Sequence, residues 1–420
     1  MNLLEKARSF DANDSLKKYR EKFHIPTDQS GKPWLYFCGN SLGLQPKTTA
    51  DYLNQELKDW ANLGVEGHFE GNTPWMPYHE FLTDAMATVV GAKSSEVVVM
   101  NTLTTNLHLA MVSFYNPVGR RKKIIIENDA FPSDRYAVAS QIKFHGGDPN
   151  SDLLVWKPRE GEELLHLEDL EALLITHKDE VALLMIGGVN YYTGQFFDLE
   201  KIADIGHRHN AMVGIDLAHG VGNIQPNLHT SNVDFAVWCT YKYLNSGPGS
   251  LGGLFVHENH AEDKNLKRFA GWWGHNKETR FNMRHDFDPI IGAEGWQLSN
   301  PPILSMAAIK ASLDIFTEVG MERLREKSIA LTGFLEELVN ELGEEVIKII
   351  TPKNPSERGC QLSIQVKNAN KKLHENLSKR NVISDWREPD VIRVAPTPLY
   401  NTFEEVYQFV EILRDEIGNL

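Results

Sequence analysis

The sequence has few cysteines and lacks long apolar runs. Only 3 of its 420 residues are cysteine, too few for a disulfide-stabilised scaffold and typical of a reducing compartment. No stretch approaches the ~18 consecutive apolar residues of a membrane span, and the best apolar run is Val181–Val189. The first residues also lack the basic patch and apolar core of a signal peptide. The sequence therefore predicts a cytoplasmic protein with no membrane partner.

Basic residues are outnumbered by acidic ones. The chain carries 43 Lys and Arg against 57 Asp and Glu, a formal net charge of −14. A surface of this sign repels nucleic acid and anionic lipid, so we expect no nucleic-acid partner. Any anionic ligand must then be held by a local site that opposes the overall field. No Cys/His cluster has the spacing of a zinc site, and no metal is predicted.

Short apolar runs alternate with amphipathic stretches between about residue 90 and residue 256. The runs that read as buried strands are Val97–Met100, Lys123–Ile126, Val181–Ile186, Met212–Ile215, Val233–Cys239 and Leu251–Val256. The stretches that read as helices are Asn106–Phe114, Asp134–Phe144 and Leu199–His209. This alternation predicts an α/β fold of three layers, with a mostly parallel sheet covered by helices on both faces.

The remaining chain predicts an arm and a second domain. A helix is expected at Ser9–Phe23, and Ser299–Pro302 interrupts the pattern before a long helical stretch from Ile303 to about Leu342, with a break near Gly320. An alternating strand over Cys360–Val366 and a final helix from Phe403 follow. We therefore predict an N-terminal arm (1–60) packing with the small domain, a large domain (61–300) and a small α+β C-terminal domain (301–420).

One glycine-rich segment imitates a nucleotide-binding fingerprint. Gly247-Pro-Gly-Ser-Leu-Gly252 has the glycine spacing of a dinucleotide site. That fingerprint must open a helix, whereas the residues that follow here read as a strand. We therefore interpret the segment as a loop.

A carboxylate and an amine follow two of the predicted strands. Asp216 comes at the end of one and Lys242 just after another. Ligands of open α/β sheets bind beyond the carboxyl ends of the strands, so both side chains should face one crevice. A lysine that forms a Schiff base and a carboxylate that pairs with a ring nitrogen are what pyridoxal 5'-phosphate requires. Taken singly, the aspartate could be a helix cap and the lysine a surface charge.

Other residues fit the same cofactor. Thr102, Thr104 and Thr105 precede a predicted helix, where hydroxyls and free amides could hold a phosphate; plain helix capping is the alternative. Phe131 follows a strand and could stack on a pyridine ring, or belong to the core. Arg393 lies on an apolar strand of the small domain, where it needs a partner. That partner is either a substrate carboxylate or an internal acid.

Seven short motifs in this order make the sequence recognisable. They are Phe37-Cys-Gly-Asn-Ser-Leu-Gly-Leu44, Phe131-Pro132-Ser133-Asp134, Asn190-Tyr-Tyr-Thr-Gly-Gln195, Asp216-Leu-Ala-His219, Tyr241-Lys-Tyr-Leu-Asn245, Ser299-Asn-Pro-Pro302 and Arg393-Val-Ala-Pro396. Along nearly its whole length the chain resembles the kynureninase family, pyridoxal-phosphate enzymes of the aspartate-aminotransferase fold type related to class V aminotransferases. The resemblance implies a homodimer, because enzymes of this fold type usually place the active site at a dimer interface.

The resemblance also implies roles for individual residues. Lys242 would carry the cofactor, Asp216 would hold the ring nitrogen, and Tyr241 would line the phosphate and ring site. Because Tyr241 adjoins Lys242 at the same strand end, it is also the candidate for proton transfer. The other residues implied at the cofactor are Leu103, Thr104, Phe131, Pro132, Ser133, Asp134, His219, Trp272 and Asn300. Arg393 would bind the substrate carboxylate, with His68 and Asn300 near the aryl end. The chain departs from the family pattern at Gly187, where a hydroxyl residue is expected, so one cofactor contact stays open.

The activity implied is hydrolysis of kynurenine or 3-hydroxykynurenine to anthranilate or 3-hydroxyanthranilate plus alanine, within tryptophan catabolism or NAD precursor synthesis. A cysteine desulfurase of the same fold is one alternative, with Cys360 as its thiol. Cys360 alternates with apolar residues on one strand face, which is typical of a core cysteine. A non-catalytic relative that only binds ligands is the other alternative, although such a chain would often lose the lysine or its carboxylate partner.

Overall fold

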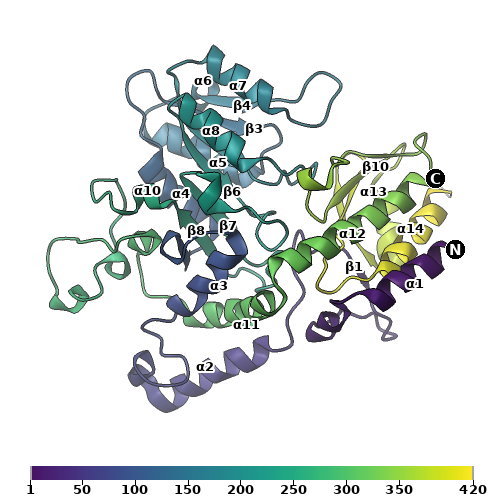
Figure 1. Ribbon diagram of the computed structural model, residues 1–420, viewed down its shortest axis with the longest axis horizontal. Helices are drawn as coiled ribbons and strands as arrows, with labels where there is room; N and C mark the ends of the chain where they lie inside the picture. Colours follow the sequence, from purple (N-terminus) through teal and green to yellow (C-terminus); the bar gives the residue numbers. More distant parts are fainter. Residues whose placement is uncertain (1, 419–420) are drawn as a thin grey trace.

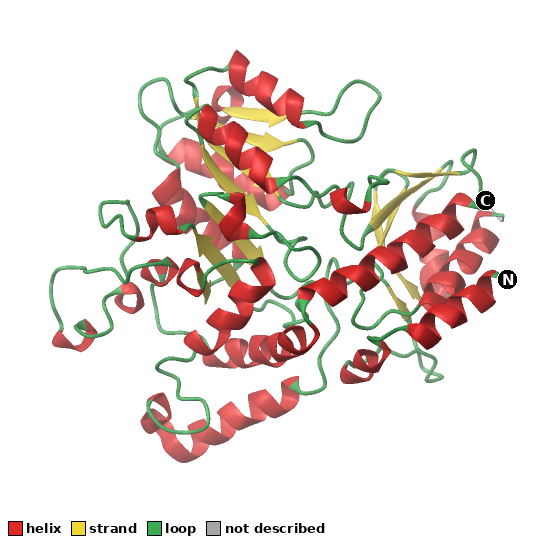
Figure 2. Cartoon of the chain, in the orientation of Figure 1, coloured by secondary structure: helices red, strands yellow, loops and turns green. Residues whose placement is uncertain are grey.

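The computed structural model describes residues 2–418. They form two bodies, each built on its own sheet, and the helix α12 (Met321–Asn340) runs from one to the other (Figure 1). The first and last helices of the described residues, which begin at Leu3 and end at Ile417, both lie on the smaller body. Figure 2 shows that the larger sheet lies between layers of helices. Within the described part of the chain, no helix is long and apolar enough to cross a bilayer.

The larger sheet has seven strands in the order β2-β8-β7-β6-β5-β3-β4. Its strands are β2 (Val97–Met100), β3 (Lys123–Glu127), β4 (Leu153–Trp156), β5 (Val181–Gly187), β6 (Met212–Asp216), β7 (Phe235–Cys239) and β8 (Gly252–Val256). Neighbours from β4 to β7 pair in parallel, and β8 pairs antiparallel with β7 and β2. The prediction of a mostly parallel sheet is confirmed.

Helices cover both faces of this sheet because successive strand residues point to opposite sides. On one face, Ile125 and Val213 share a core with α3, α7, α8 and α11; on the other, Ile124 and Val237 pack with α4 and α5. The helices of this body are α2 (Thr49–Leu63), α3 (Glu80–Val90), α4 (Leu103–Phe114), α5 (Pro132–Phe144), α6 (Pro149–Asp152), α7 (Leu167–Thr176), α8 (Leu199–Arg208), α9 (Leu228–Ser231), α10 (Glu258–Ala261) and α11 (Ile303–Val319). The three-layer prediction is thereby confirmed.

The smaller body has a four-stranded antiparallel sheet in the order β12-β13-β10-β9, and a separate parallel pair β1-β11. Its strands are β1 (Leu35–Tyr36), β9 (Ile347–Ile349), β10 (Leu362–Val366), β11 (Val382–Ile383), β12 (Asp385–Arg387) and β13 (Val391–Val394). Its helices are α1 (Leu3–Asn13), α12, α13 (Lys371–Lys379) and α14 (Phe403–Ile417). Short 3₁₀ turns are η1 (Lys17–Lys22), η2 (Gly64–His68), η3 (Ser94–Glu96), η4 (Trp272–Gly274), η5 (Arg280–Asn282), η6 (Ala293–Trp296) and η7 (Pro355–Glu357).

The prediction of one helix over Ser9–Phe23 is wrong. The helix α1 begins earlier, where Asn2 and Glu5 form a reciprocal capping box, and it ends at Asn13. The side chain of Asp14 accepts a hydrogen bond from the Leu16 amide, 2.8 Å away, and turns the chain. The predicted break at Gly320 is confirmed, since α11 ends at Val319. The domain boundaries at residues 60 and 300 stay a prediction.

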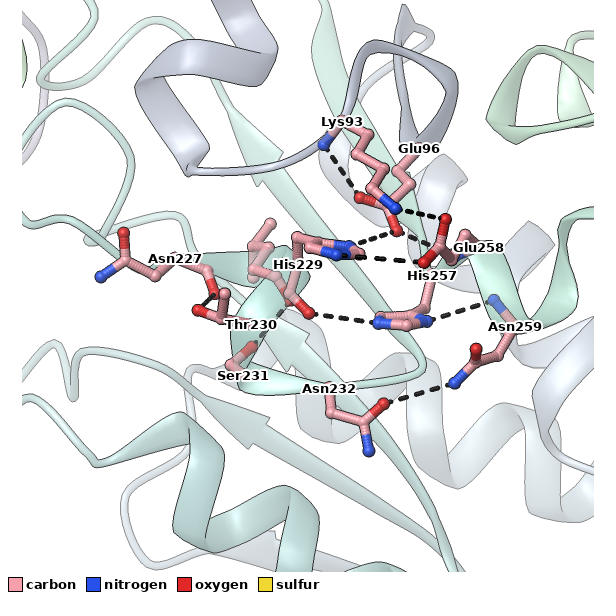
Figure 3. A network of polar contacts seen from close by, with 11 residues as sticks. Lys93, Glu96, Asn227, His229, Thr230, Ser231, Asn232, His257, Glu258 and Asn259 are labelled. Atoms are coloured by element: carbon pink, nitrogen blue, oxygen red, sulfur yellow. Dashed lines mark hydrogen bonds and ion pairs between the residues drawn. The ribbon is translucent and has the colours of Figure 1, made fainter.

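A hydrogen-bonded network closes the edge of the large sheet where β2 begins and β8 ends (Figure 3). The fully buried Glu96 carboxylate accepts hydrogen bonds from the Lys93 amide at 2.9 Å, the Glu258 amide at 2.9 Å and the His229 ring at 3.0 Å. The rings of His229 and His257 stack in parallel, 5.4 Å apart. The ring nitrogens of His229 and His257 carry their lone pairs in the ring planes, and the lone pairs of two parallel rings do not point at one position. The network therefore fits a structural role better than metal binding.

Candidate active site

The opposite edge of the large sheet holds a cavity of about 120 Å³. Its walls come from the strand ends at Glu127, Gly187 and Asp216, and from the loop after β7. The predicted residues that line it are Leu103, Thr104, Phe131, Ser133, Asp134, Asp216, His219, Tyr241 and Lys242. The structure therefore brings most of the predicted cofactor residues together, although they are spread over more than a hundred positions of the sequence.

Two helices begin at the mouth of the cavity. Thr102 is the N-cap of α4 and Phe131 the N-cap of α5, with Pro132 as the first residue of α5. The Thr104 and Ser133 hydroxyls lie 2.9 Å apart and join the two helix starts. Free backbone amides and hydroxyls at paired helix N-termini suit a phosphate group. Thr102 instead faces the Thr105 hydroxyl at 3.2 Å on the exposed side, away from the cavity.

A pair of buried carboxyl groups lies on the cavity floor. Asp216 accepts a 2.6 Å hydrogen bond from the Ala218 amide and interacts with the Asp134 side chain. Burial raises the pKa of both carboxyls, and the Asp216 charge raises the pKa of Asp134 further. The buried Oδ1 of Asp134 has no hydrogen-bond partner among residues 2–418. This carboxyl pair therefore has room for a cationic donor such as a protonated ring nitrogen.

Lys242 faces these acids from the loop after β7. Its Nζ lies 5.9 Å from the centroid of the Phe131 ring. His219 is buried in the same wall, and its pKa is lowered well below its usual value by burial and by the Lys242 charge, so its ring is neutral. The Gly43 amide donates a 2.9 Å hydrogen bond to the Tyr241 carbonyl. A Cβ at Gly43 would lie 2.2 Å from the Lys242 carbonyl oxygen, so this glycine allows the N-terminal loop to support the lysine.

Arg393 lies behind the cavity rather than in its wall. It is buried on β13, donates a 2.6 Å hydrogen bond to the Tyr191 carbonyl and pairs with the Asp385 carboxylate. Burial lowers its pKa to about 10. Tyr191, which does line the cavity, contacts the Phe131 ring edge to face at 5.4 Å. The sequence predicted that Arg393 would pair either with an internal acid or with a substrate carboxylate. The internal acid is present as Asp385, and a role for Arg393 with a substrate carboxylate stays a prediction.

Besides Pro132 and Arg393, three further predicted residues do not line the cavity of a single chain. Trp272 and Asn300 are exposed on the surface. The His68 ring nitrogen Nδ1 hydrogen-bonds the Val65 carbonyl at 3.0 Å, and the ring packs against Trp75. Their roles therefore stay predictions that depend on a second chain or on a bound ligand.

Sequence reasoning missed four lining residues, the apolar Val189 and Ala218 and the polar Glu127 and Tyr191. Glu127 is buried at the last position of β3 and accepts a 3.0 Å hydrogen bond from the Gly187 amide. The available signal was an acid at the end of an apolar strand, in the sequence Lys-Ile-Ile-Ile-Glu.

Solved structures that superpose on this chain include cysteine desulfurases. A cysteine desulfurase from Thermococcus onnurineus NA1 superposes with a TM-score of 0.77 at 18% identity, covering 96% of this chain and 99% of that chain. The cysteine desulfurase CsdA from Escherichia coli gives 0.77 at 15% identity, covering 96% and 98%. The chain therefore has the same overall fold as these two enzymes.

The sequence comparisons are more specific. Kynureninases from Myxococcus xanthus (strain DK1622) and Koribacter versatilis (strain Ellin345) are 55% and 54% identical to this chain, covering 97% and 96% of it and 96% of each relative. The kynureninase of Flavobacterium psychrophilum is 52% identical over 99% of this chain and 98% of its own length. The sequence model of the kynureninase C-terminal domain matches residues 324–413. The chain belongs to the kynureninase family.

Proposed function

We propose that this chain uses pyridoxal 5'-phosphate to hydrolyse L-kynurenine or 3-hydroxy-L-kynurenine. One water is added across the bond between Cβ and Cγ of the substrate, which gives L-alanine and anthranilate or 3-hydroxyanthranilate. The observation that carries the proposal is the Lys242 amine facing the Asp216–Asp134 carboxyl pair, beside the Phe131 ring, in one cavity. Membership of the kynureninase family supports the choice of substrate.

The residues of the cavity fit this cofactor. Lys242 offers the amine for its aldehyde, and Asp216 offers a carboxylate for its ring nitrogen. Thr104 and Ser133, at the two helix starts, offer donors for its phosphate. Phe131 offers an aromatic face. When bound, pyridoxal phosphate withdraws electrons from the bonds at the substrate Cα.

The protein's own groups then handle protons and orientation. Once released by the substrate amine, Lys242 is a free amine in the same cavity and takes the Cα proton as a general base. Asp216 stays negative when it faces a cationic ring nitrogen, because an opposite charge favours the ionised carboxylate. Tyr241 lies next to the lysine and is our candidate for proton transfer at the γ-carbonyl. Arg393 would orient the α-carboxylate.

We also propose a cytoplasmic homodimer. Large apolar side chains are exposed around the residues that lie outside the single-chain cavity: Trp60, Phe69, Phe81, Trp272, Phe281 and Met283. Exposed apolar surface of this kind favours association with another copy. A second subunit offers a way for His68, Asn300 and Trp272 to approach the aryl end of a substrate. We infer a place in the kynurenine pathway of tryptophan catabolism or NAD precursor synthesis.

The alternative thiol chemistry is disfavoured by the surroundings of Cys360. Its side chain is fully buried, and burial raises its pKa to about 12. A thiol that attacks a cofactor-bound substrate must instead be accessible and ionisable. No observation in the structure favours a desulfurase over a kynureninase.

Two measurements test the proposal. Borohydride reduction of the cofactor-loaded protein should leave a pyridoxyl adduct on Lys242, located by peptide mass analysis. Kynurenine should give fluorescent anthranilate, and Lys242→Ala should abolish both signals. The ratio of kcat/KM for kynurenine and 3-hydroxykynurenine then tests the proposed aryl contacts. A loaded protein that turns over neither substrate would refute the function, and an adduct on another lysine would refute the site.

A further inference from the structure

Glu127 and Gly187 meet in the cofactor cavity across neighbouring strands. Glu127 ends β3 and Gly187 ends β5, two strands that pair in parallel. Both residues line the cavity. The Glu127 side chain is buried, and its Oε2 accepts a 3.0 Å hydrogen bond from the Gly187 amide. A carboxyl group is therefore fixed in the cavity wall by the main chain of the next strand.

The glycine at position 187 makes room for that carboxyl. Gly187 is not among the residues with positive φ, so its backbone would accept any L-residue. A Cβ at this position would lie 2.6 Å from the Glu127 Oε1, and the next nearest atoms are 3.6 Å or more away. The carboxyl oxygen is the one close obstacle to a side chain here. The missing side chain is thus explained by Glu127 and not by a turn.

The Glu127 carboxyl lies among other acids. Burial raises its pKa to about 7, and the charges of Asp216 and Asp129 raise it in the same direction. The titratable groups that face it are Asp129, Asp134, Tyr191 and Asp216. Lys242 lines the same cavity. A neutral Glu127 can donate a hydrogen bond into the cavity, whereas an ionised one would stabilise a cation on Lys242.

We propose that Glu127 is a third carboxyl of the cofactor site, beside Asp134 and Asp216, and that it positions the cofactor. The absence of a side chain at Gly187 leaves room for it. Glu127 contributes to cofactor affinity and sets the pH at which the cofactor bound to Lys242 changes its visible absorbance. This inference rests on the proposed function. Glu127, from the neighbouring strand, would then supply the cofactor contact expected from a hydroxyl residue at position 187.

The test compares Glu127→Gln, Gly187→Ala and the double variant with the unaltered protein. Glu127→Gln keeps an acceptor for the Gly187 amide and removes the negative charge. Without that charge a protonated Lys242 adduct is less stable, so the midpoint of the absorbance change should fall by about 1 pH unit. Gly187→Ala should expel the carboxyl and lower the midpoint in the same way. Each variant should also weaken the binding of added pyridoxal phosphate by about threefold or more.

The decisive result is the double variant. If both substitutions act by removing one carboxyl from one place, their effects should not add, and the double variant should resemble the single ones. Additive effects, an unmoved or raised midpoint in Glu127→Gln, or an unchanged Gly187→Ala would overturn the proposal. Gly187→Ala also serves as the independent probe if Glu127→Gln folds poorly.

A control separates this role from general effects of burial. Glu96→Gln removes another buried carboxylate, at the opposite edge of the sheet, and should leave the midpoint unchanged. If the unaltered protein forms no adduct at Lys242, the proposed function fails and this role fails with it. Normal loading and turnover with unmoved midpoints in the variants would refute only the role of Glu127.

Discussion

Replacing Asp234 by asparagine should destabilise the protein without touching its chemistry. Asp234 precedes β7, and its buried carboxylate accepts hydrogen bonds from the Val213 amide at 2.6 Å, from His207 at 3.0 Å and from His260 at 2.7 Å. These bonds tie β6, α8 and α10 together at the edge opposite Lys242. The histidine at the end of α8 therefore has a specific acid partner, in addition to the favourable helix dipole expected there.

The size of the effect follows from the pKa of this carboxyl. Burial alone would raise it, but the hydrogen bonds from His207, His260 and Val213 lower it from 3.8 to about 2. That difference corresponds to about 2 kcal/mol of folding free energy. In a unit of this size the loss should lower Tm by about 5 °C or more.

The pH dependence has two limits. A carboxylate with a lowered pKa contributes stability above its unfolded value of 3.8, and the contribution is lost as pH falls toward 2. The hydrogen bond that His207 donates to the Asp234 carboxylate raises the pKa of His207, so that group contributes fully below its unfolded value of 6.5 and less as pH rises through the folded value. The difference between Asp234→Asn and the unaltered protein should therefore be largest between pH 4 and pH 6.5.

Thermal unfolding followed by tryptophan fluorescence across this pH range measures the difference. Asp204→Asn is the matched control, because it removes an exposed ion pair with Arg208 on the same helix and should cost under about 1 kcal/mol. Cofactor binding by Asp234→Asn should be unchanged at temperatures where it is folded. A difference that does not shrink below pH 4, or a variant as stable as the control, would refute the reasoning.

Three further substitutions test single contacts by steady-state kinetics. Asp385→Asn should raise KM more than it lowers kcat, because Asp385 pairs with both Arg387 and Arg393 and so orients the proposed carboxylate-binding group; an unchanged KM would contradict this. Cys360→Ala should leave turnover of kynurenine intact, since the thiol is fully buried, and loss of activity would revive the desulfurase alternative. Tyr241→Phe should lower kcat about tenfold or more, and an unaltered kcat would remove its proposed role.

The core strands could be predicted because their apolar runs are short and bounded by polar residues. The run at Val97–Met100 matches its strand. Others extend further than the apolar pattern, since β3, β5 and β6 end at Glu127, Gly187 and Asp216. Main-chain pairing does not depend on side-chain polarity, so a strand continues through a polar last residue. These last residues form part of the cavity wall.

The sequence could not decide contacts between distant loops. From the sequence alone, Arg393 could bind a substrate carboxylate or pair with an internal acid. The fold places Asp385 next to Arg393 and so identifies the internal partner. His68 and Asn300 were inferred from family likeness, which says nothing about whether one chain or two complete the site. The turn at Asp14 was missed for a different reason, because a side-chain hydrogen bond to the chain two residues on ended a helix that apolar spacing would have continued.

The acidic composition and an anionic cofactor are compatible because the site does not depend on many cations. Among the residues that line the cavity, Lys242 is the one lysine or arginine, beside the acids Glu127, Asp134 and Asp216. Burial raises the pKa of all three, so they do not all repel a phosphate as full charges. The phosphate can instead be held by hydroxyls and by amides at two helix starts, which are neutral donors. The Lys242 amine is then not needed to neutralise the phosphate and is available for the reaction.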